Sequence, residues 1–444
     1  MTPEAFSQAL GKCGIQQGAR VLAAVSGGAD SLCLLWLLAQ IRHEYPLEVE
    51  CAHAEHGLRG SASLEDLEFV GNICGAWGIP FHAEHLNVPA HREIGSTEEA
   101  ARVLRYAFLR RVAAESGCCC ILTAHHRGDQ AETVLMRAVR GTDIRGLSAM
   151  AAREGDLARP LLNCTPAELR ACLQEHGICW REDDSNLDTS FSRNRIRHLV
   201  MPELEKVAPG AEQALCRLAG AAARDESFFD GQLLVLQLDR PIRLADGAAI
   251  GRSKAEGLHP ALASRALVRL ITAAGAQQDA RLIERSLEIL EQQSRDAVLN
   301  LPGNGRLCFG EQYICAVFPG KPIPVTAIVS GETRTPFGRF ILRRAESSER
   351  GDGKNRQGLS DAMIRGLTVG TRLPGETMVP FGKHKPQEIR KLISDAGVEP
   401  AMRRSVPVLR NRQGAVWLAG LRPSELCRLD GAPEWILEYE GARG

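Results

Sequence analysis

A glycine turn between two apolar segments, close to the start of the chain, constrains the fold more than any other feature. The run Arg-Val-Leu-Ala-Ala-Val at residues 20–25 is short and apolar, as in a buried strand of a parallel sheet. The run at residues 32–39 is apolar and helix-forming, which predicts a helix packed against that sheet. Between them, Gly27 and Gly28 allow the sharp change of direction that joins a strand to a helix. The expected fold class is therefore α/β.

The same turn carries the groups that an anion-binding loop needs. Its glycines let backbone N–H groups approach a phosphate, and Ser26 and Ser31 add hydroxyl donors. Asp30 supplies a carboxylate that could hold a phosphate-bound Mg²⁺. The common phosphate loop needs a lysine after its glycines, and none follows Gly28 here. A plain strand-to-helix turn with a serine N-cap is the alternative.

Taken as a unit, Ser26-Gly27-Gly28-Ala29-Asp30-Ser31 resembles the pyrophosphate-binding loop of the N-type ATP pyrophosphatases, the PP-loop superfamily. The resemblance implies a Rossmann-like, doubly wound parallel sheet and ATP as the cosubstrate, split between its α and β phosphates. In such enzymes a substrate oxygen is adenylated, and a nucleophile then displaces AMP. The loop alone does not indicate which substrate is modified.

Composition limits the class of protein. At 444 residues the chain is too long for one ordinary core, so two or three domains are expected. Charged residues make up 24% and hydrophobic residues 44%, as in soluble globular proteins. The N-terminus has no basic or apolar signal region, and the longest apolar run is too short to span a bilayer. The 14 cysteines include no C-x-x-C pair, so we expect free thiols in the cytoplasm rather than a zinc ribbon or a redox dithiol.

Strands and helices alternate through the first half of the chain. Further strands are predicted at residues 47–54, 80–86 and 118–124, and helices at 63–77, 98–116 and 129–140. Such βα units form a parallel sheet with helices on both faces, and ligands bind beyond the carboxyl ends of its strands. The motifs described below follow these strand ends, so one shared site is expected.

The pattern changes twice further along the chain. Alanine- and leucine-rich helices are predicted at residues 211–225, 260–274 and 279–293, and strands and turns continue from residue 306 to the end. The first of these strands, at 306–309 and 313–318, flank a turn at residues 310–312. This predicts a catalytic α/β domain at 1–210, a mainly helical domain at 211–325 and a small β-containing α+β domain at 326–444.

Two basic stretches stand out, although the net charge of the chain is zero. The first is a compact cluster of Arg193, Arg195 and Arg197. The second runs over residues 383–412 and includes Lys383, Lys385, Arg390, Lys391 and Arg403. Local patches of this kind bind phosphate backbones even on a neutral protein. A solvated helix face is an equally good interpretation of either patch.

Two further motifs contain candidate nucleotide contacts. Residues 53–59 follow the second strand and carry histidines and an arginine, although a polar loop with a structural histidine explains them as well. Arg102 and Arg105 are spaced to share one helical face, where an arginine aimed at ATP would stabilise developing charge. Salt bridges to Glu98 or Glu99 are the alternative, and they suit Arg102 better.

His125 and Asp129 follow the strand predicted at 118–124. Their spacing would bring them to one face of a helix, and a His–carboxylate pair can orient a nucleophile and take its proton. Helix capping by Asp129 is the alternative. A zinc site is weaker, because no further ligand stands at a recognisable spacing.

These motifs together make nearly the whole chain resemble the tRNA(Ile)-lysidine synthetase family. The resemblance rests on His56-Gly57-Leu58-Arg59, Ala101-Arg102, Arg105-Tyr106, Ala124-His125-His126, Asp129-Gln130, Glu132-Thr133, Arg140-Gly141, Glu182-Asp183, Ser185-Asn186, Arg193-Asn194, Ile196-Arg197, Pro374-Gly375-Glu376, Phe381-Gly382 and Val406-Pro407-Val408-Leu409. That family converts the wobble cytidine of a CAU anticodon to lysidine. ATP adenylates O2 of the cytosine, and the ε-amine of free lysine then attacks C2 and expels AMP.

The resemblance implies a role for each candidate. Residues 26–31 would hold the phosphates, with Asp30 on Mg²⁺, and Arg105, His125 and Asp129 match the family's catalytic residues. Arg193, Arg195 and Arg197 would guide the anticodon backbone. The domain at 211–325 and the basic stretch at 383–412 would bind tRNA, the latter at its acceptor end. The expected partners are ATP, free lysine and tRNA(Ile) with a CAU anticodon, and a homodimer is left open.

Some residues depart from the family's pattern. Gly128 stands where an acidic or amide residue is usual, Asp143 where glycine is usual, Asp184 where proline is common, and Glu376 where aspartate is usual. Glu132 and Asp143 are candidate lysine-binding carboxylates. A PP-loop tRNA thiolase is the nearest alternative function, but the missing C-x-x-C pairs argue against it. A tRNA-binding relative without catalysis is the other.

Overall fold

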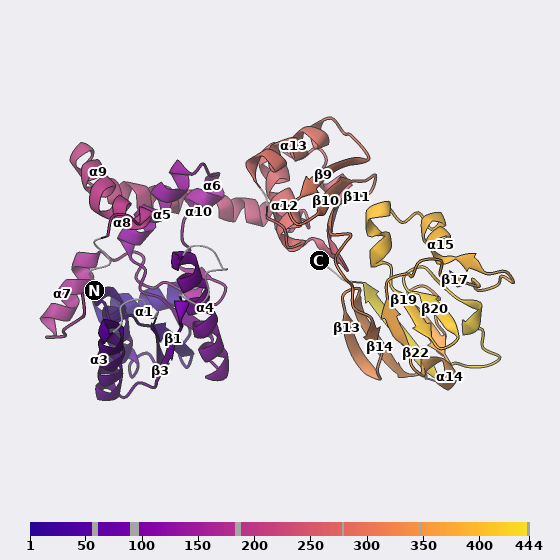
Figure 1. Ribbon diagram of the computed structural model, residues 1–444, viewed down its shortest axis with the longest axis horizontal. Helices are drawn as coiled ribbons and strands as arrows, with labels where there is room; N and C mark the ends of the chain where they lie inside the picture. Colours follow the sequence, from indigo (N-terminus) through magenta and orange to yellow (C-terminus); the bar gives the residue numbers. More distant parts are fainter. Residues whose placement is uncertain (56–60, 89–96, 183–187, 278, 347–348, 442–444) are drawn as a thin grey trace. The chain divides into compact units, whose positions relative to one another are not determined.

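The computed structural model describes residues 1–55, 61–88, 97–182, 188–277, 279–346 and 349–441. It divides into two compact units, residues 1–227 and 228–444 (Figure 1). Within the described ranges, no helix combines the length and apolarity that a bilayer crossing needs. The motif at 56–59 and the residues 183–187 lie outside the described part. The predicted three-domain division stays a prediction.

The first unit is built on a six-stranded sheet of order β3-β2-β1-β4-β6-β5. Every pairing from β3 to β6 is parallel, and β5 adds an antiparallel edge. Its strands are β1 (Arg20–Ala24), β2 (Glu48–Glu55), β3 (Phe81–His85), β4 (Cys120–Leu122), β5 (Arg153–Glu154) and β6 (Leu157–Ala158). The predicted doubly wound fold is confirmed, although β4 is shorter than the predicted strand at 118–124.

Helices cover both faces of this sheet. The helical elements of this part of the chain are α1 (Pro3–Lys12), α2 (Ala29–Ile41), α3 (Ser61–Trp77), α4 (Thr97–Glu115), α5 (Arg127–Val139), α6 (Ile144–Leu147), α7 (Pro166–Glu175), α8 (Ser192–Arg195), the π-helical turn η4 (Ile196–Val200), α9 (Met201–Val207) and α10 (Ala211–Val235), which continues past the boundary at residue 227. Side chains of β1 alternate, so that Val21 and Ala23 face a core shared with α1, α2, α3 and α7, whereas Leu22 faces a core shared with α4.

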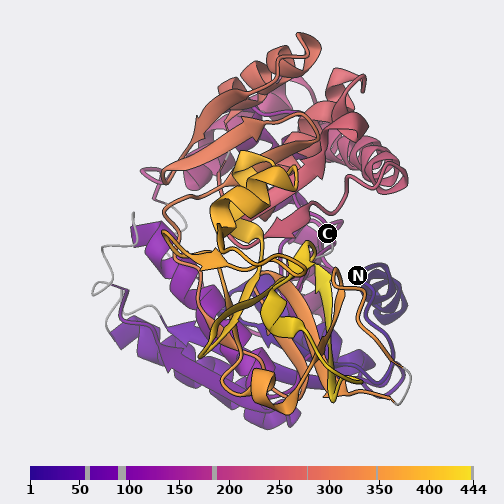
Figure 2. The same ribbon diagram turned by 90° about the vertical axis from the view of Figure 1, so that its right-hand side faces the viewer.

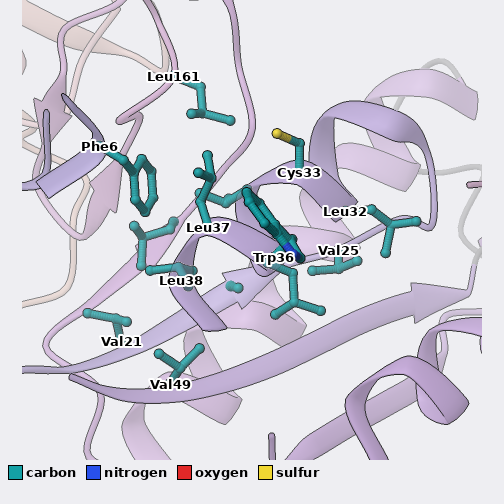
Figure 3. Packing of buried hydrophobic residues seen from close by; sticks show 14 of the residues in the cluster. Phe6, Val21, Val25, Leu32, Cys33, Trp36, Leu37, Leu38, Val49 and Leu161 are labelled. Atoms are coloured by element: carbon teal, nitrogen blue, oxygen red, sulfur yellow. The ribbon is translucent and has the colours of Figure 1, made fainter. Parts of the chain in front are cut away.

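Helix α2 is apolar on every side because it lies inside the larger of these cores. Leu32, Cys33, Leu37 and Leu38 are all fully buried, and Figure 3 shows them among Phe6, Val21, Val49 and Leu161. The tight packing fixes the start of α2 at the carboxyl end of β1, where the glycine turn stands.

The second unit begins with an antiparallel sheet of order β7-β8-β11-β10-β9. The strands of this sheet and the helices between them are β7 (Ile242–Leu244), β8 (Gly247–Gly251), α11 (Arg252–Ala255), α12 (Pro260–Ala273), α13 (Ala280–Glu291), β9 (Ala297–Leu301), β10 (Gly305–Phe309) and β11 (Tyr313–Val317). The predicted helices are present, and the predicted hairpin around residues 310–312 joins β10 to β11. Strands β7, β8 and β9 were not predicted, and the strands of the second unit therefore begin well before residue 306.

Two further sheets, β12-β16-β19-β20-β21 and β13-β14-β22-β15, are drawn in orange to yellow in Figure 2. They share one core that contains Phe340, Trp417 and Leu437. The strands are β12 (Thr326–Ala327), β13 (Gly331–Thr335), β14 (Gly338–Arg344), β15 (Arg356–Leu359), β16 (Thr368–Gly370), β19 (Val408–Asn411), β20 (Gly414–Leu418), β21 (Arg422–Pro423) and β22 (Trp435–Gly441). Around them lie α14 (Asp361–Ile364), β17 (Thr377–Met378), β18 (Gln387–Glu388), α15 (Ile389–Asp395), η5 (Pro400–Ser405) and η6 (Glu425–Cys427).

A buried ion pair fastens η5 to the antiparallel sheet. The guanidinium of Arg404 donates to the carboxylate of Asp246, in the β7–β8 turn, at 3.1 Å. The hydroxyl of Ser405 donates to the other Asp246 oxygen at 3.3 Å. Asp246 is 1% exposed, so these donors satisfy a carboxylate that water does not reach.

Candidate active site

The candidate site lies where the order of the sheet reverses, between β1 and β4. The chain leaves β1 toward β2 on one side, and β4 is the neighbour on the other side. In open α/β sheets, ligands bind in the crevice that forms at this point, beyond the carboxyl ends of the strands. Asp30 lies in the first turn of α2, directly after the loop that follows β1, and the loop after β4 carries His125 and His126.

The loop after β1 has an open helix start. Gly27 has φ +93°, which only glycine adopts without strain, and Gly28 is the N-cap of α2 without a side-chain capping bond. The hydroxyl of Ser31 donates to the Gly28 carbonyl at 2.9 Å and accepts the Ser26 N–H at 3.2 Å. Ser26 and Ser31 therefore shape the loop, and the first N–H groups of α2 are left for an anion.

Asp30 presents a carboxylate oxygen that lacks a partner. Its Oδ1 is buried and makes no hydrogen bond with any residue that the structure describes. Burial raises the pKa of Asp30 above its ordinary value, against the opposing effect of His126. An orphaned, desolvated carboxylate beside a phosphate-type loop is what a hard cation such as Mg²⁺ would satisfy. Within the described ranges, no group of three or more potential ligands could hold a metal by itself.

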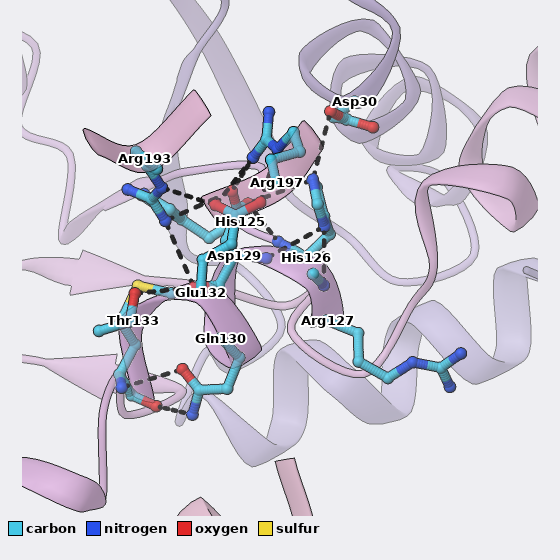
Figure 4. A network of polar contacts seen from close by, with 12 residues as sticks. Asp30, His125, His126, Arg127, Asp129, Gln130, Glu132, Thr133, Arg193 and Arg197 are labelled. Atoms are coloured by element: carbon cyan, nitrogen blue, oxygen red, sulfur yellow. Dashed lines mark hydrogen bonds and ion pairs between the residues drawn. The ribbon is translucent and has the colours of Figure 1, made fainter. Parts of the chain in front are cut away.

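His126 is the N-cap of α5 and links the two loops. Its Nδ1 accepts the N–H groups of Gly128 at 3.0 Å and Asp129 at 3.4 Å. The neutral ring must therefore carry its proton on Nε2, which faces Asp30 Oδ2 at 3.7 Å and Asp129 Oδ2 at 3.4 Å (Figure 4). The side chain of Asp129 accepts the His126 N–H at 3.0 Å and completes a capping box.

This geometry corrects one prediction and supports another. His125 precedes α5, so it does not share a helical turn with Asp129, and its ring instead bonds Thr123 Oγ1 at 2.8 Å. The capping alternative for Asp129 holds, since its carboxylate does cap the helix. Helix α5 starts at Arg127, two residues before the predicted start, because a histidine acts as its cap.

Two carboxylates on α5 form ion pairs with two arginines from the segment 192–200. Glu132, which is 3% exposed, accepts Arg197 Nε at 2.6 Å and Arg193 Nε at 2.8 Å. Asp129 Oδ1 accepts Arg197 Nη2 at 2.9 Å. Burial pushes the pKa of Asp129 upward, but His126 and Arg193 outweigh it, and the pKa lies below its ordinary value. Asp129 is therefore ionised at neutral pH.

His125 and Arg105 lie close to this network. Burial lowers the pKa of His125 to about 4, so its ring is neutral at pH 7; the charges of Asp129, Arg159, Arg193 and Arg105 also act on it. Burial likewise lowers the pKa of Arg105, whose guanidinium lies 5.5 Å from the centroid of the Tyr106 ring. Arg102 lies over the same ring at 5.0 Å but is exposed.

The other predicted site residues are distributed as follows. Arg195 is exposed, on the far side of α8 from the carboxylates. Lys383, Lys385, Arg390 and Lys391 in the second unit are exposed, and none forms an ion pair with a described residue, whereas Arg403 Nε donates to the Val398 carbonyl at 2.9 Å. Asp143 caps α6, and Glu376 pairs with Arg410, so both departures have structural uses.

Comparison with known proteins gives the family. Residues 3–204 match the model of the PP-loop domain, and residues 367–438 match that of the TilS substrate C-terminal domain. A tRNA(Ile)-lysidine synthase of Geobacter sulfurreducens is 33% identical over 93% of this chain and 91% of its own length. The chain belongs to the tRNA(Ile)-lysidine synthase family.

A second relative agrees with membership of this family. The tRNA(Ile)-lysidine synthase of Solibacter usitatus is 30% identical over 92% of this chain and 94% of its own length. Among solved structures, a U34-tRNA thiolase of Methanococcus maripaludis is similar at a TM-score of 0.41 and 19% identity, over 49% of this chain and 77% of that one. That TM-score is too low to establish a shared fold by itself.

Two residues central to the site, His126 and Glu132, were not predicted in the positions that they hold. His126 stood in a quoted motif, and its spacing to Asp129 was the signal, because it has the form of a capping box with histidine in place of serine. Glu132 was only a candidate for lysine binding. Its central place depends on arginines more than sixty residues away along the chain, which no local pattern reveals.

Proposed function

We propose that this chain is an ATP-dependent ligase that joins free lysine to C2 of the wobble cytidine in the CAU anticodon of tRNA(Ile). Family membership supports this proposal. The observation that carries it is the facing arrangement of Asp30, His126 and Asp129 across the β1–β4 crevice. The reaction would take place in the cytoplasm, where ATP, lysine and tRNA meet.

The first step adenylates the base. O2 of the cytosine attacks the α-phosphorus of ATP, the bond from that phosphorus to the β-phosphate oxygen breaks, and pyrophosphate leaves. The N–H groups at the start of α2 and the hydroxyl of Ser26 would hold the departing pyrophosphate. Arg105 would neutralise negative charge on the phosphates. Mg²⁺, when bound at Asp30, would supply charge neutralisation on the same phosphates.

The second step replaces the activated oxygen by nitrogen. The ε-amine of lysine attacks C2, the bond from C2 to the adenylated oxygen breaks, and AMP leaves. The ammonium form is not a nucleophile, so the amine must lose a proton before or during attack. Asp129 is ionised and is the carboxylate we assign to hold this amine. His125, neutral at pH 7, would accept a hydrogen bond or pass the proton on, because a pKa of about 4 makes it a weak base.

The arginines divide into two groups under this proposal. Arg193 and Arg197 hold Asp129 and Glu132 in place, so they act as positioning residues rather than as the RNA track. Arg195 stays available to the anticodon backbone. The exposed Lys383, Lys385, Arg390 and Lys391 would hold the acceptor end of the tRNA.

The decisive test is incorporation of labelled lysine. We expect the wild-type protein to transfer lysine to CAU-anticodon tRNA when ATP is present and to release one AMP and one pyrophosphate for each lysine. Folded wild-type protein that transfers no lysine would overturn the proposal, and transfer of sulfur instead would favour the thiolase alternative.

A matched pair of variants tests the role of Asp30. Asp30→Asn should abolish pyrophosphate release and keep the fold, because its carboxylate gains little from the described protein groups. Asp156→Asn is the control: Asp156 directly precedes β6, at the amino ends of the parallel strands and away from the crevice, and makes an exposed pair with Arg110. Equal activity of both variants would remove the role assigned to Asp30.

A further inference from the structure

The segment 192–200 has two different faces. Its inward face carries Arg193 and Arg197, which are committed to Asp129 and Glu132. Residues one helical turn apart share a face, so Arg195, two positions after Arg193, points the other way. That other face is not used by the ion-pair network.

The outward face combines an aromatic ring with a cation. Phe191 is 44% exposed, and Arg195 is exposed one turn later; the Arg195 N–H donates to the Phe191 carbonyl at 2.9 Å, which fixes this spacing. Leu199, 50% exposed, continues the face. The guanidinium of Arg195 forms no ion pair or hydrogen bond within the described part of the chain. An exposed aromatic beside a positive charge that no described residue compensates is a surface suited to an anionic, planar partner.

Local hydrogen bonds order the backbone on either side of Phe191. Asp188 Oδ1 accepts the Ser190 N–H at 2.9 Å, and the Asn194 amide donates to the Asp188 carbonyl at 3.0 Å. The backbone that carries Phe191 is therefore tied to the start of α8. A backbone ordered in advance reduces the conformational entropy that is lost when a flat ligand stacks on the ring.

We propose that Phe191 is a stacking platform for an unpaired nucleobase of the anticodon loop, next to the reacting cytidine, and that Arg195 pairs with a neighbouring phosphate. This proposal rests on the proposed function. Stacking on an aromatic side chain replaces the base–base stacking that the anticodon loses when the cytidine is drawn out. A second copy of this chain would leave Arg195 without an anion, so charge complementarity favours RNA.

The test is a binding measurement that needs no catalysis. The probe is tRNA with a CAU anticodon in which 2-aminopurine replaces the adenosine. We expect the wild-type protein to quench its fluorescence, because the stacked base loses emission. Phe191→Ala and Phe191→Leu should lose this quenching and bind about 10-fold more weakly, the loss typical of one stacked base. Phe191→Tyr should retain both, since it keeps the aromatic face.

Controls separate stacking from a general surface effect. Phe228→Ala removes another exposed aromatic ring and should leave the quenching unchanged. Arg195→Gln should weaken binding and reduce the slope of log K against log salt by about 1, as for one lost phosphate contact. In turnover, Phe191→Ala should raise KM for tRNA with little change in kcat or in KM for ATP.

The outcomes distinguish this proposal from the proposed function. Quenching that survives in both Phe191→Ala and Phe191→Leu would overturn the stacking role, even if lysine is transferred normally. Quenching by wild-type protein that transfers no lysine would overturn the proposed function and leave the platform standing. If Phe191→Ala instead converts a dimer to monomers with unchanged RNA binding, the face joins two copies of the chain and the proposal is wrong.

Discussion

Protonation of His125 should couple the stability of the first unit to pH. The ordinary pKa of a histidine is 6.5, and burial lowers that of His125 to about 4. In the unfolded chain the ring takes up a proton below pH 6.5, whereas in the folded protein it does so only near pH 4. Stability is therefore full above pH 6.5 and is lost progressively as the pH falls toward 4.

The size of the effect follows from the shift. Each pKa unit corresponds to about 1.4 kcal/mol. Between pH 7 and pH 5 the unfolded form gains most of its proton while the folded form gains almost none, so His125 alone should reduce the free energy of unfolding by about 2 kcal/mol. His125→Gln removes this contribution and should make the pH dependence shallower by the same amount.

The assay must follow the first unit by itself, because two compact units need not unfold together. The protein is equilibrated in urea at pH 7 or pH 5 and then labelled with a brief deuterium pulse at one fixed pH. The deuterium taken up by peptides from β4 and α5 reports how much of the first unit is unfolded. His43→Gln, at an exposed position, controls for the exchange of imidazole for amide. If wild type and His125→Gln lose the same stability between the two pH values, the burial argument is wrong.

Three further outcomes follow from particular contacts. Arg105→Lys should slow pyrophosphate release about 100-fold if the guanidinium faces the phosphates, whereas Arg102→Lys, exposed over the same Tyr106 ring, should stay near wild type in the same assay. Glu132→Gln leaves Arg193 and Arg197 with one carboxylate and should lower the free energy of unfolding by about 2 kcal/mol, measured by pulsed exchange. The loss is held to this size because both arginines are partly exposed. An unchanged unfolding midpoint would contradict the stabilising role of these ion pairs. Arg404→Met leaves Asp246 buried without its cation and should lower the free energy of unfolding by about 3 kcal/mol. The double variant with Asp246→Asn should recover a large part of this loss. If the losses of the two single variants simply add, the two residues are not coupled.

Sequence reasoning succeeded where the information is local. The apolar runs at 20–25 and 32–39 match β1 and α2, since each is bounded by its own glycine or polar turn. The hairpin of β10 and β11 was likewise predicted from its turn residues. Strand β8 was missed because its short run consists mostly of alanine and glycine, and pairing with β7 and β11 stabilises it as a strand. Strand β7 was missed because it has only three residues and depends on pairing with β8.

The candidate site shows the same limit. Ser26, Asp30 and Asp129 could be singled out from their motifs, whereas the pairing of Asp30 with His126 and of Glu132 with Arg193 depends on tertiary placement. The sequence also drew attention to His125 rather than His126. Both histidines follow the same strand, and only the position of the helix start decides which ring turns toward Asp30.

The sheet order has a consequence for synthesis of the chain. Strands β1 and β4 are direct neighbours, yet about a hundred residues separate them, so the crevice between them does not exist until most of the first unit has left the ribosome. A nascent chain that ends before β4 carries the glycine turn but lacks the loop after β4, which forms the other side of the crevice. Binding of ATP would therefore stabilise the complete sheet over its partly assembled forms.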